Sequence, residues 1–97
     1  MTTIQIEDQP KTRPRLALYV NAWCGYCFRV RRVIAAEELD IPLRDIAEPE
    51  HLRALVEATG RRTVPVLRIV HADEREHWMP ESRDIITYLR GLAQEVD

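Results

Sequence analysis

The sequence predicts an α/β fold of one domain in the order βαβαββα, with a mixed four-stranded sheet and helices on both faces. A short apolar run at 16–20 is typical of a buried strand, and the next residues repeat their apolar positions with the period of a helix. A second strand and helix follow, which implies a parallel pair with a right-handed crossover. Two late strands joined by a short connection indicate an antiparallel hairpin, which makes the sheet mixed.

The first strand is predicted at 16–20 and the first helix at 24–39. The proline of the segment 40–42 ends this helix, because its ring cannot continue a helical turn. One helix face is apolar, whereas the arginines and glutamates between its members turn to water; the apolar positions are Cys27, Val30, Val33 and Ile34.

The second half of the chain supplies the remaining elements. Residues 43–47 alternate apolar and charged side chains, as a second strand would. A second helix opens with Pro49 between two glutamates and closes at Gly60. Strands are predicted at 64–70 and 76–79, and Ser82 is expected to cap the last helix. The apolar side of that helix comprises Ile85, Ile86, Leu89, Leu92 and Val96.

Composition and charge restrict the class of protein. The 97 residues are 45% hydrophobic and 31% charged, and the net charge of -2 gives no reason to expect nucleic acid or a membrane as partner. The first residues lack the basic and apolar regions of a secretion signal, and no apolar run is long enough to span a bilayer. We therefore expect a cytoplasmic monomer with a flexible tail at 1–14 and one domain at 15–97.

The only two cysteines, Cys24 and Cys27, lie two residues apart where the first predicted helix begins. Free backbone N–H groups at that end favour the thiolate form of Cys24. Cys27 lies one turn later on the same face, so it can attack a disulfide that Cys24 has formed. The spacing therefore indicates thiol–disulfide exchange.

Three other uses of the cysteine pair are weaker. A zinc site needs two more ligands, and the remaining candidates are scattered without ligand spacing; they are His51, His71 and His77. A structural disulfide that closes so short a loop removes little chain entropy and is unusual in a reducing cytosol. Two buried, unreactive cysteines rarely fall at this spacing behind a strand.

Over residues 15–92 the chain resembles a glutaredoxin of the thioredoxin-like superfamily. Four features carry the resemblance: Trp-Cys-Gly-Tyr-Cys at 23–27, Gly-Arg-Arg at 60–62, Thr-Val-Pro at 63–65, and Pro-Glu-Ser-Arg-Asp at 80–84. A thioredoxin would carry proline at position 26, where this chain has Tyr26. The resemblance implies a thioredoxin-like fold and a dithiol glutaredoxin that reduces protein–glutathione mixed disulfides and protein disulfides. Its partners would be glutathione, as co-substrate, and oxidised or glutathionylated proteins.

The resemblance also implies roles around Cys24. In the family the proline of Thr63-Val64-Pro65 is cis and faces the active cysteine, so that the Val64 backbone pairs with the cysteine of glutathione. An ordinary proline at the start of a strand is the alternative. Trp23 and Tyr26 would wall the cleft, although either is equally an ordinary surface or core aromatic residue.

The two ends of glutathione have candidate partners as well. Glu81 and Ser82 resemble the pair with which glutathione transferases hold the γ-glutamyl group, Ser82 taking the carboxylate and Glu81 the ammonium. The same residues also satisfy a helix cap without any ligand. Arg62, or its neighbour Arg61, is the candidate for the glycyl carboxylate, and both are equally explained as solvated loop residues.

Departures from the family pattern leave the small thiol open. Asn21 stands where many glutaredoxins carry lysine, and Gly25 replaces a common proline. The run Trp-Cys-Gly-Tyr-Cys also resembles mycoredoxins, which use mycothiol. Some glutaredoxins hold a [2Fe-2S] cluster between two subunits, which Gly25 permits without implying. We expect no permanently bound cofactor and no metal, with a mycothiol-dependent reductase and a cluster-binding glutaredoxin as alternatives.

Overall fold

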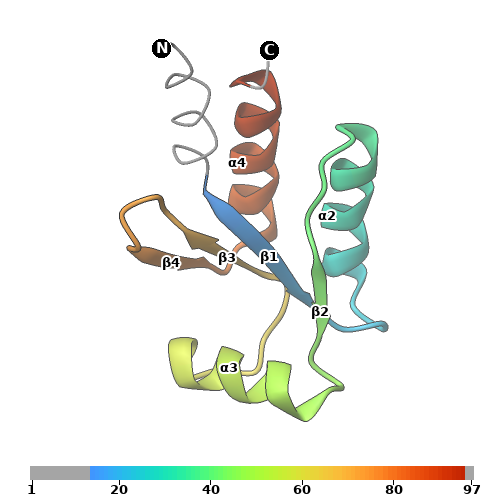
Figure 1. Cartoon of the computed structure of the whole chain (residues 1–97). Helices are drawn as coiled ribbons and strands as arrows, with labels where there is room; N and C mark the ends of the chain where they lie inside the picture. The colour runs from blue at the N-terminus through green and yellow to red at the C-terminus, as the bar shows by residue number, and fades with distance from the viewer. Residues whose placement is uncertain (1–13, 96–97) are drawn as a thin grey trace.

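The computed structural model describes residues 14–95 and confirms the predicted element order (Figure 1). The tail expected at 1–14 falls, except for Pro14, outside the described residues, as does Val96. The elements are β1 (Arg15–Val20), α2 (Gly25–Ala36), β2 (Leu43–Asp45), α3 (Pro49–Thr59), β3 (Val66–Val70), β4 (Glu76–Met79) and α4 (Ser82–Glu95).

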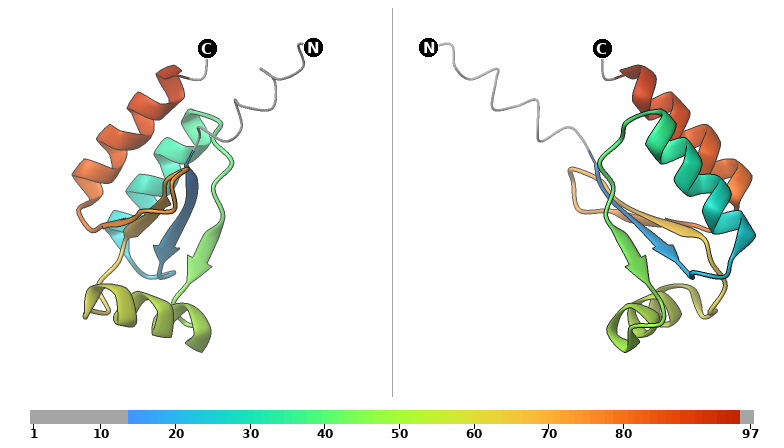
Figure 2. Two further views of the ribbon diagram at one scale, coloured as in Figure 1. Left: turned by 60° about the vertical axis from the view of Figure 1, so that its left-hand side comes forward. Right: turned by 90° about the vertical axis from the view of Figure 1, so that its right-hand side faces the viewer.

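The four strands form one mixed sheet in the order β2-β1-β3-β4. β1 runs parallel to β2 and antiparallel to β3, and β4 pairs antiparallel with β3. Helices α2 and α4 lie side by side on one face of the sheet, whereas α3 lies on the other (Figures 1 and 2). The sheet with helices on both faces is therefore confirmed.

Successive side chains of the central strands point to opposite faces of the sheet, and this alternation produces two core clusters. On the side of α2 and α4, Leu18 and Leu67 pack with Val30, Ile85 and Leu89, all fully buried. On the other side a smaller cluster holds α3 against the sheet; it consists of Ala17, Tyr19, Leu55 and Val66. Helix α2 thus packs against the sheet and against its neighbour α4. This packing positions the N-terminus of α2 at the carboxyl end of β1.

Helix α2 ends at Ala36, three residues before the predicted end. Glu38 takes a left-handed conformation with φ of 56°. The Leu39 N–H then donates to the Ile34 carbonyl at 3.0 Å, and the Glu38 N–H donates to the Ala35 carbonyl at 3.1 Å. These two bonds form a Schellman motif, which closes the helix before the proline is reached.

Two strands are also shorter than predicted. β2 stops at Asp45, because the Asp45 carboxylate accepts from the Ala47 N–H at 2.8 Å and turns the chain. β3 begins at Val66, after a cis peptide bond between Val64 and Pro65. No helix within residues 14–95 is long and apolar enough to cross a membrane.

The expected cap of α4 is corrected by the structure. Ser82 is the first helical residue, and the Glu81 carbonyl accepts the Ile85 N–H at 2.9 Å. Glu81 therefore occupies the N-cap position. The Ser82 hydroxyl makes no hydrogen bond within residues 14–95, so capping does not account for this side chain.

Candidate active site

Cys24 is the N-cap residue of α2. Its Sγ accepts a hydrogen bond from the Cys27 N–H at 3.2 Å, as a serine oxygen does at many helix starts. Asn21 shapes the loop before it, since its side-chain oxygen accepts from the Trp23 N–H at 3.0 Å and its carbonyl from the Cys24 N–H at 3.2 Å. The sulfur of Cys24 is thus held at the positive end of a helix dipole, and its residue is half-buried.

Cys27 is a free thiol in a different environment. It is only 1% exposed and belongs to the core cluster beneath α2. Burial, together with the hydrogen bond to Cys24, raises the pKa of Cys27 to about 12. The two cysteines are therefore unequal, because one reaches the surface and the other is a protonated core thiol.

Pro65 lies across the site from α2. The Val64–Pro65 peptide bond is cis, as the resemblance implied. As a thiol, Cys24 donates to the Val64 carbonyl with a sulfur–oxygen distance of 3.6 Å. The Val64 backbone thus faces the sulfur, and Pro65 is buried behind it.

An open cleft of about 860 Å³ begins at these residues. Five residues singled out from the sequence line it, namely Tyr26, Val64, Pro65, Glu81 and Ser82. They come from α2, from the segment before β3 and from the start of α4, so only the folded chain brings them together. The cleft has the size of a small-molecule site and is polar at the α4 end.

Five expected residues are absent from the lining of the cleft. Two of them are Cys24 and Cys27, although the Cys24 sulfur contacts the carbonyl of Val64, which borders the cleft. Trp23 is 95% exposed and therefore packs against almost nothing, which contradicts its expected place in the wall. Arg62 and Thr63 are exposed in the loop before Val64 and are absent from the lining. Arg61 is exposed as well, and its N–H donates to the Thr59 hydroxyl at 3.2 Å.

Three arginines line the cleft without having been expected there. They are Arg29 from α2 and Arg83 and Arg90 from α4. Arg83, Thr87 and Arg90 fall at helical spacing, which predicts a common face of α4. Only the packing of α2 against α4 decides that this face meets Arg29.

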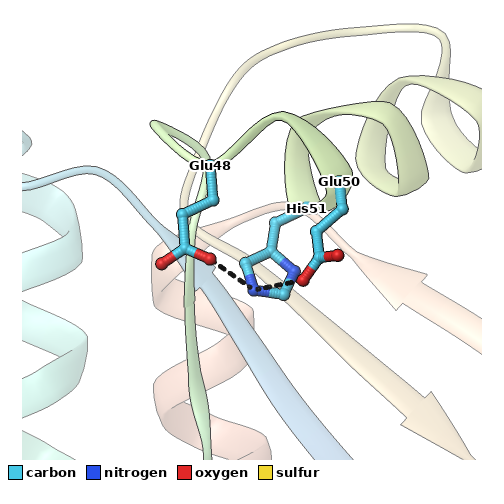
Figure 3. A group of neighbouring side chains, drawn as sticks. All are labelled: Glu48, Glu50 and His51. Atoms are coloured by element: carbon cyan, nitrogen blue, oxygen red, sulfur yellow. Dashed lines mark ion pairs between the residues drawn. The ribbon is translucent and has the colours of Figure 1, made fainter.

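A second group of polar side chains lies at the start of α3, away from the cleft (Figure 3). The His51 Nε2 atom is 3.5 Å from Glu48 and 3.9 Å from Glu50, and the two carboxylates lie on either side of the ring. Each residue offers one atom that could bind a metal ion, and these three atoms lie within 4.8 Å of one another. Both glutamates are exposed, and acids in a first helical turn are stabilised by the dipole alone. We interpret the group as surface ion pairs.

A dithiol at the start of the first helix, opposite a cis-proline, on this sheet defines a thioredoxin-like domain of the glutaredoxin type. The sequence profile of the glutathione S-transferase N-terminal domain matches residues 18–96, and the chain belongs to this family. Two proteins assigned as glutaredoxins, one from each of two strains of Mycobacterium tuberculosis, are 36% identical over 58 residues. That alignment covers 55% of this chain and 66% of each relative.

Two solved structures with bound glutathione are similar to the whole fold. Maleylacetoacetate isomerase from Anaeromyxobacter dehalogenans is 26% identical over 87% of this chain and 40% of its own, with a TM-score of 0.65. Glutaredoxin 2 from Salmonella typhimurium is 25% identical over 79% of this chain and 33% of its own, with a TM-score of 0.62. This chain thus spans less than half of either protein. Together with the family match, these relatives support an enzyme of the thiol redox or transferase kind.

Proposed function

We propose that the chain is a glutathione-dependent thiol–disulfide oxidoreductase in which Cys24 is the nucleophile and Cys27 an auxiliary thiol. The carrying observation is the inequality of the two cysteines. The Cys24 sulfur lies 3.6 Å from the carbonyl oxygen of Val64, a residue that lines the cleft, whereas Cys27 is buried with a raised pKa. Only an accessible sulfur at a helix N-terminus can begin an exchange reaction.

The proposed reaction needs no other oxidant or reductant. The Cys24 thiolate attacks the glutathione sulfur of a protein–glutathione disulfide, and the protein thiolate leaves and takes a proton from water. A second glutathione, as thiolate, attacks the glutathione sulfur bound to Cys24. This step releases glutathione disulfide and restores the Cys24 thiolate.

Cys27 provides a second exit. In the Cys24–glutathione adduct, the Cys27 sulfur would attack the Cys24 sulfur and lose its proton, and glutathione would leave and take up that proton. The intramolecular disulfide so formed is reduced by two further glutathiones, which leave as glutathione disulfide. The raised pKa of Cys27 makes its thiolate scarce at neutral pH, which supports the glutathione exit as the main route. Cys27 then matters most for substrates that contain a protein disulfide.

The cleft offers partners for the rest of glutathione. The exposed Glu81 carboxylate has no ion pair within residues 14–95 and would take the γ-glutamyl ammonium. The unused Ser82 hydroxyl and the N–H groups of α4 would take its carboxylate. The Val64 backbone would pair with the cysteine of glutathione. Glutathione bound in the isomerase and in glutaredoxin 2 supports this assignment.

The test is the oxidation of NADPH in a cycle of glutathione and glutathione reductase, with a glutathionylated peptide as substrate. We expect turnover by the wild type and by Cys27→Ser, and none by Cys24→Ser. The opposite pattern in the two variants would overturn the assignment of roles. A folded wild type without turnover would overturn glutathione dependence.

Mycothiol is the second candidate for the small thiol, favoured by the resemblance of Trp-Cys-Gly-Tyr-Cys at 23–27 to mycoredoxins. The same cycle run with mycothiol and its reductase distinguishes the two thiols. A ratio of kcat/KM values above one for mycothiol over glutathione would favour this candidate.

A [2Fe-2S] cluster is a poorer fit to these residues. Cluster iron requires four thiolates, and Cys24 is the chain's only cysteine that is not buried. A single chain therefore cannot complete the shell, and we derive no step through a cluster.

A further inference from the structure

The cleft extends well beyond Cys24 along α4. Its lining on this helix runs from Ser82 to Arg90, which is about 12 Å at the rise of an α-helix. A second concavity of about 260 Å³ shares Arg29 and Arg90 with the cleft and adds Arg32 from α2. Figure 2 shows the two helices side by side, so the two hollows follow one seam.

Four arginines border this seam, and we call it the arginine groove: Arg29, Arg32, Arg83 and Arg90. None of them forms an ion pair within residues 14–95. Arg29 lies over the Tyr26 ring, 5.7 Å from its centroid. Arg15, Arg68 and Arg75 pair with carboxylates, whereas the other arginines within residues 14–95 do not. What distinguishes the four arginines of the groove is that they line one hollow.

Three carboxylates share the groove with the four arginines, which leaves it a formal excess of one positive charge. Glu37, Glu81 and Asp84 also line it, yet none is within ion-pair distance of an arginine. Glu81 is assigned to the ammonium of glutathione in the proposed function. Asp84 lies in the first turn of α4, where the helix dipole stabilises it. The far part of the groove is therefore rich in unpaired guanidinium groups, although the whole chain has a net charge of -2.

We propose that the arginine groove binds an acidic segment of the protein whose mixed disulfide Cys24 attacks. This inference rests on the proposed function, because the glutathione sulfur that Cys24 attacks is bonded to the substrate cysteine, which therefore lies next to the bound glutathione. An extended segment advances about 3.3 Å per residue, so about four residues span the part of the groove that follows α4 from Ser82 to Arg90. We therefore place the recognised carboxylates three to five residues from the substrate cysteine. Arginine forks pair with carboxylates through two hydrogen bonds, which suits this partner.

The test uses three glutathionylated peptides of otherwise identical sequence. At the positions three to five residues from the cysteine, one peptide carries Glu, the second Gln and the third Lys. We expect kcat/KM for the Glu peptide to exceed that for the Gln peptide by about tenfold, since two or three exposed pairs are formed. The Lys peptide should be the poorest substrate. Added salt should reduce these differences, because it screens exposed charges.

Arg90→Glu is the informative variant, and Arg53→Glu is its matched control. Arg53 is an exposed α3 residue outside the groove, so the two variants change the net charge equally. We expect Arg90→Glu to bring the Glu-to-Gln ratio to about one and Arg53→Glu to keep it. Equal effects of both variants, or a wild-type ratio of one, would overturn the proposal.

Binding separates this inference from the proposed function. The Glu and Gln peptides with serine in place of cysteine are added to ¹⁵N-labelled protein. We expect the Glu peptide alone to shift the amide signals of Arg83, Thr87 and Arg90. If no glutathionylated peptide turns over, the proposed function fails, and the amide shifts still decide the groove. Unchanged amide signals of Arg83, Thr87 and Arg90 on addition of the Glu peptide would overturn the proposed role of the arginine groove.

Discussion

The contrast between the two cysteines gives a prediction that can be measured directly. Cys24→Ser leaves Cys27 as the only thiol, and Cys27→Ser leaves Cys24. Each variant is mixed with a chromogenic aromatic disulfide near neutral pH, natively and in denaturant. The ratio of unfolded to native rate reports how strongly the fold suppresses each thiol.

The expected suppression of Cys27 follows from its pKa. Burial, together with the hydrogen bond to the side chain at position 24, raises this pKa from 9.0 to about 12. A serine at position 24 can still accept that bond, and the shift lowers the thiolate fraction at neutral pH by about a thousandfold. A more basic thiolate is a better nucleophile, and a Brønsted coefficient of about 0.45 over this shift restores about twentyfold. Ionisation alone therefore slows Cys27 by about fiftyfold, and its 1% exposure slows it further.

The single-cysteine rates decide the matter. Cys27 should react at least about fifty times more slowly in the native state than in denaturant. Cys24 should react in the native state far faster than Cys27. A Cys27 rate within a few-fold of its unfolded rate would refute the argument from burial. Circular dichroism of the Cys24→Ser variant checks that it is folded.

Three further predictions concern stability. The protonated Cys27 stabilises the fold fully below pH 9, and this contribution is lost as pH rises toward about 12. Between pH 7 and 10 the wild type should therefore lose about 1 kcal/mol more stability than Cys27→Ala in urea unfolding. Glu38→Gly should raise the free energy of unfolding by about 0.5–1 kcal/mol, because a left-handed residue costs about 1–2 kcal/mol and glycine loses about 0.5–1 in chain entropy; a lower urea midpoint would contradict this. Tyr19→Phe should change the free energy of unfolding by less than about 1 kcal/mol, because the buried Tyr19 hydroxyl makes no hydrogen bond of good geometry and has the nearby Arg68 guanidinium as a polar neighbour. A loss above about 1 kcal/mol in thermal unfolding would show that the contact with Arg68 is a full hydrogen bond.

Sequence reasoning located the elements well where the signal is local. The helix at 49–59 was predicted with its proline start and its glycine end, because both signals act within one turn. The end of α2 was placed too late. Glu38 adopts the left-handed conformation that a glycine usually adopts at the end of a helix. Because no glycine stands there, no signal in the sequence indicated that α2 ends at this point.

For the candidate site, too, the sequence predicted the features that depend on local spacing and missed those that depend on packing. The spacing of Cys24 and Cys27 on one helix is visible in the sequence, since helical geometry relates residues three apart. The exposure of Trp23 and the freedom of the Ser82 hydroxyl were not visible, because they depend on which neighbours happen to pack there.

By itself, the sequence determined the element order, the mixed sheet and the position of the dithiol at a helix start. Each follows from periodicity, end signals and spacing within a short stretch of chain. Only the tertiary structure decided that Cys27 is buried to a pKa of about 12 and that Arg29 meets Arg83 and Arg90 across one cleft. Those properties arise from the packing of α2 against α4 and the sheet, where residues about 60 apart in the chain become neighbours, and no local pattern encodes that contact.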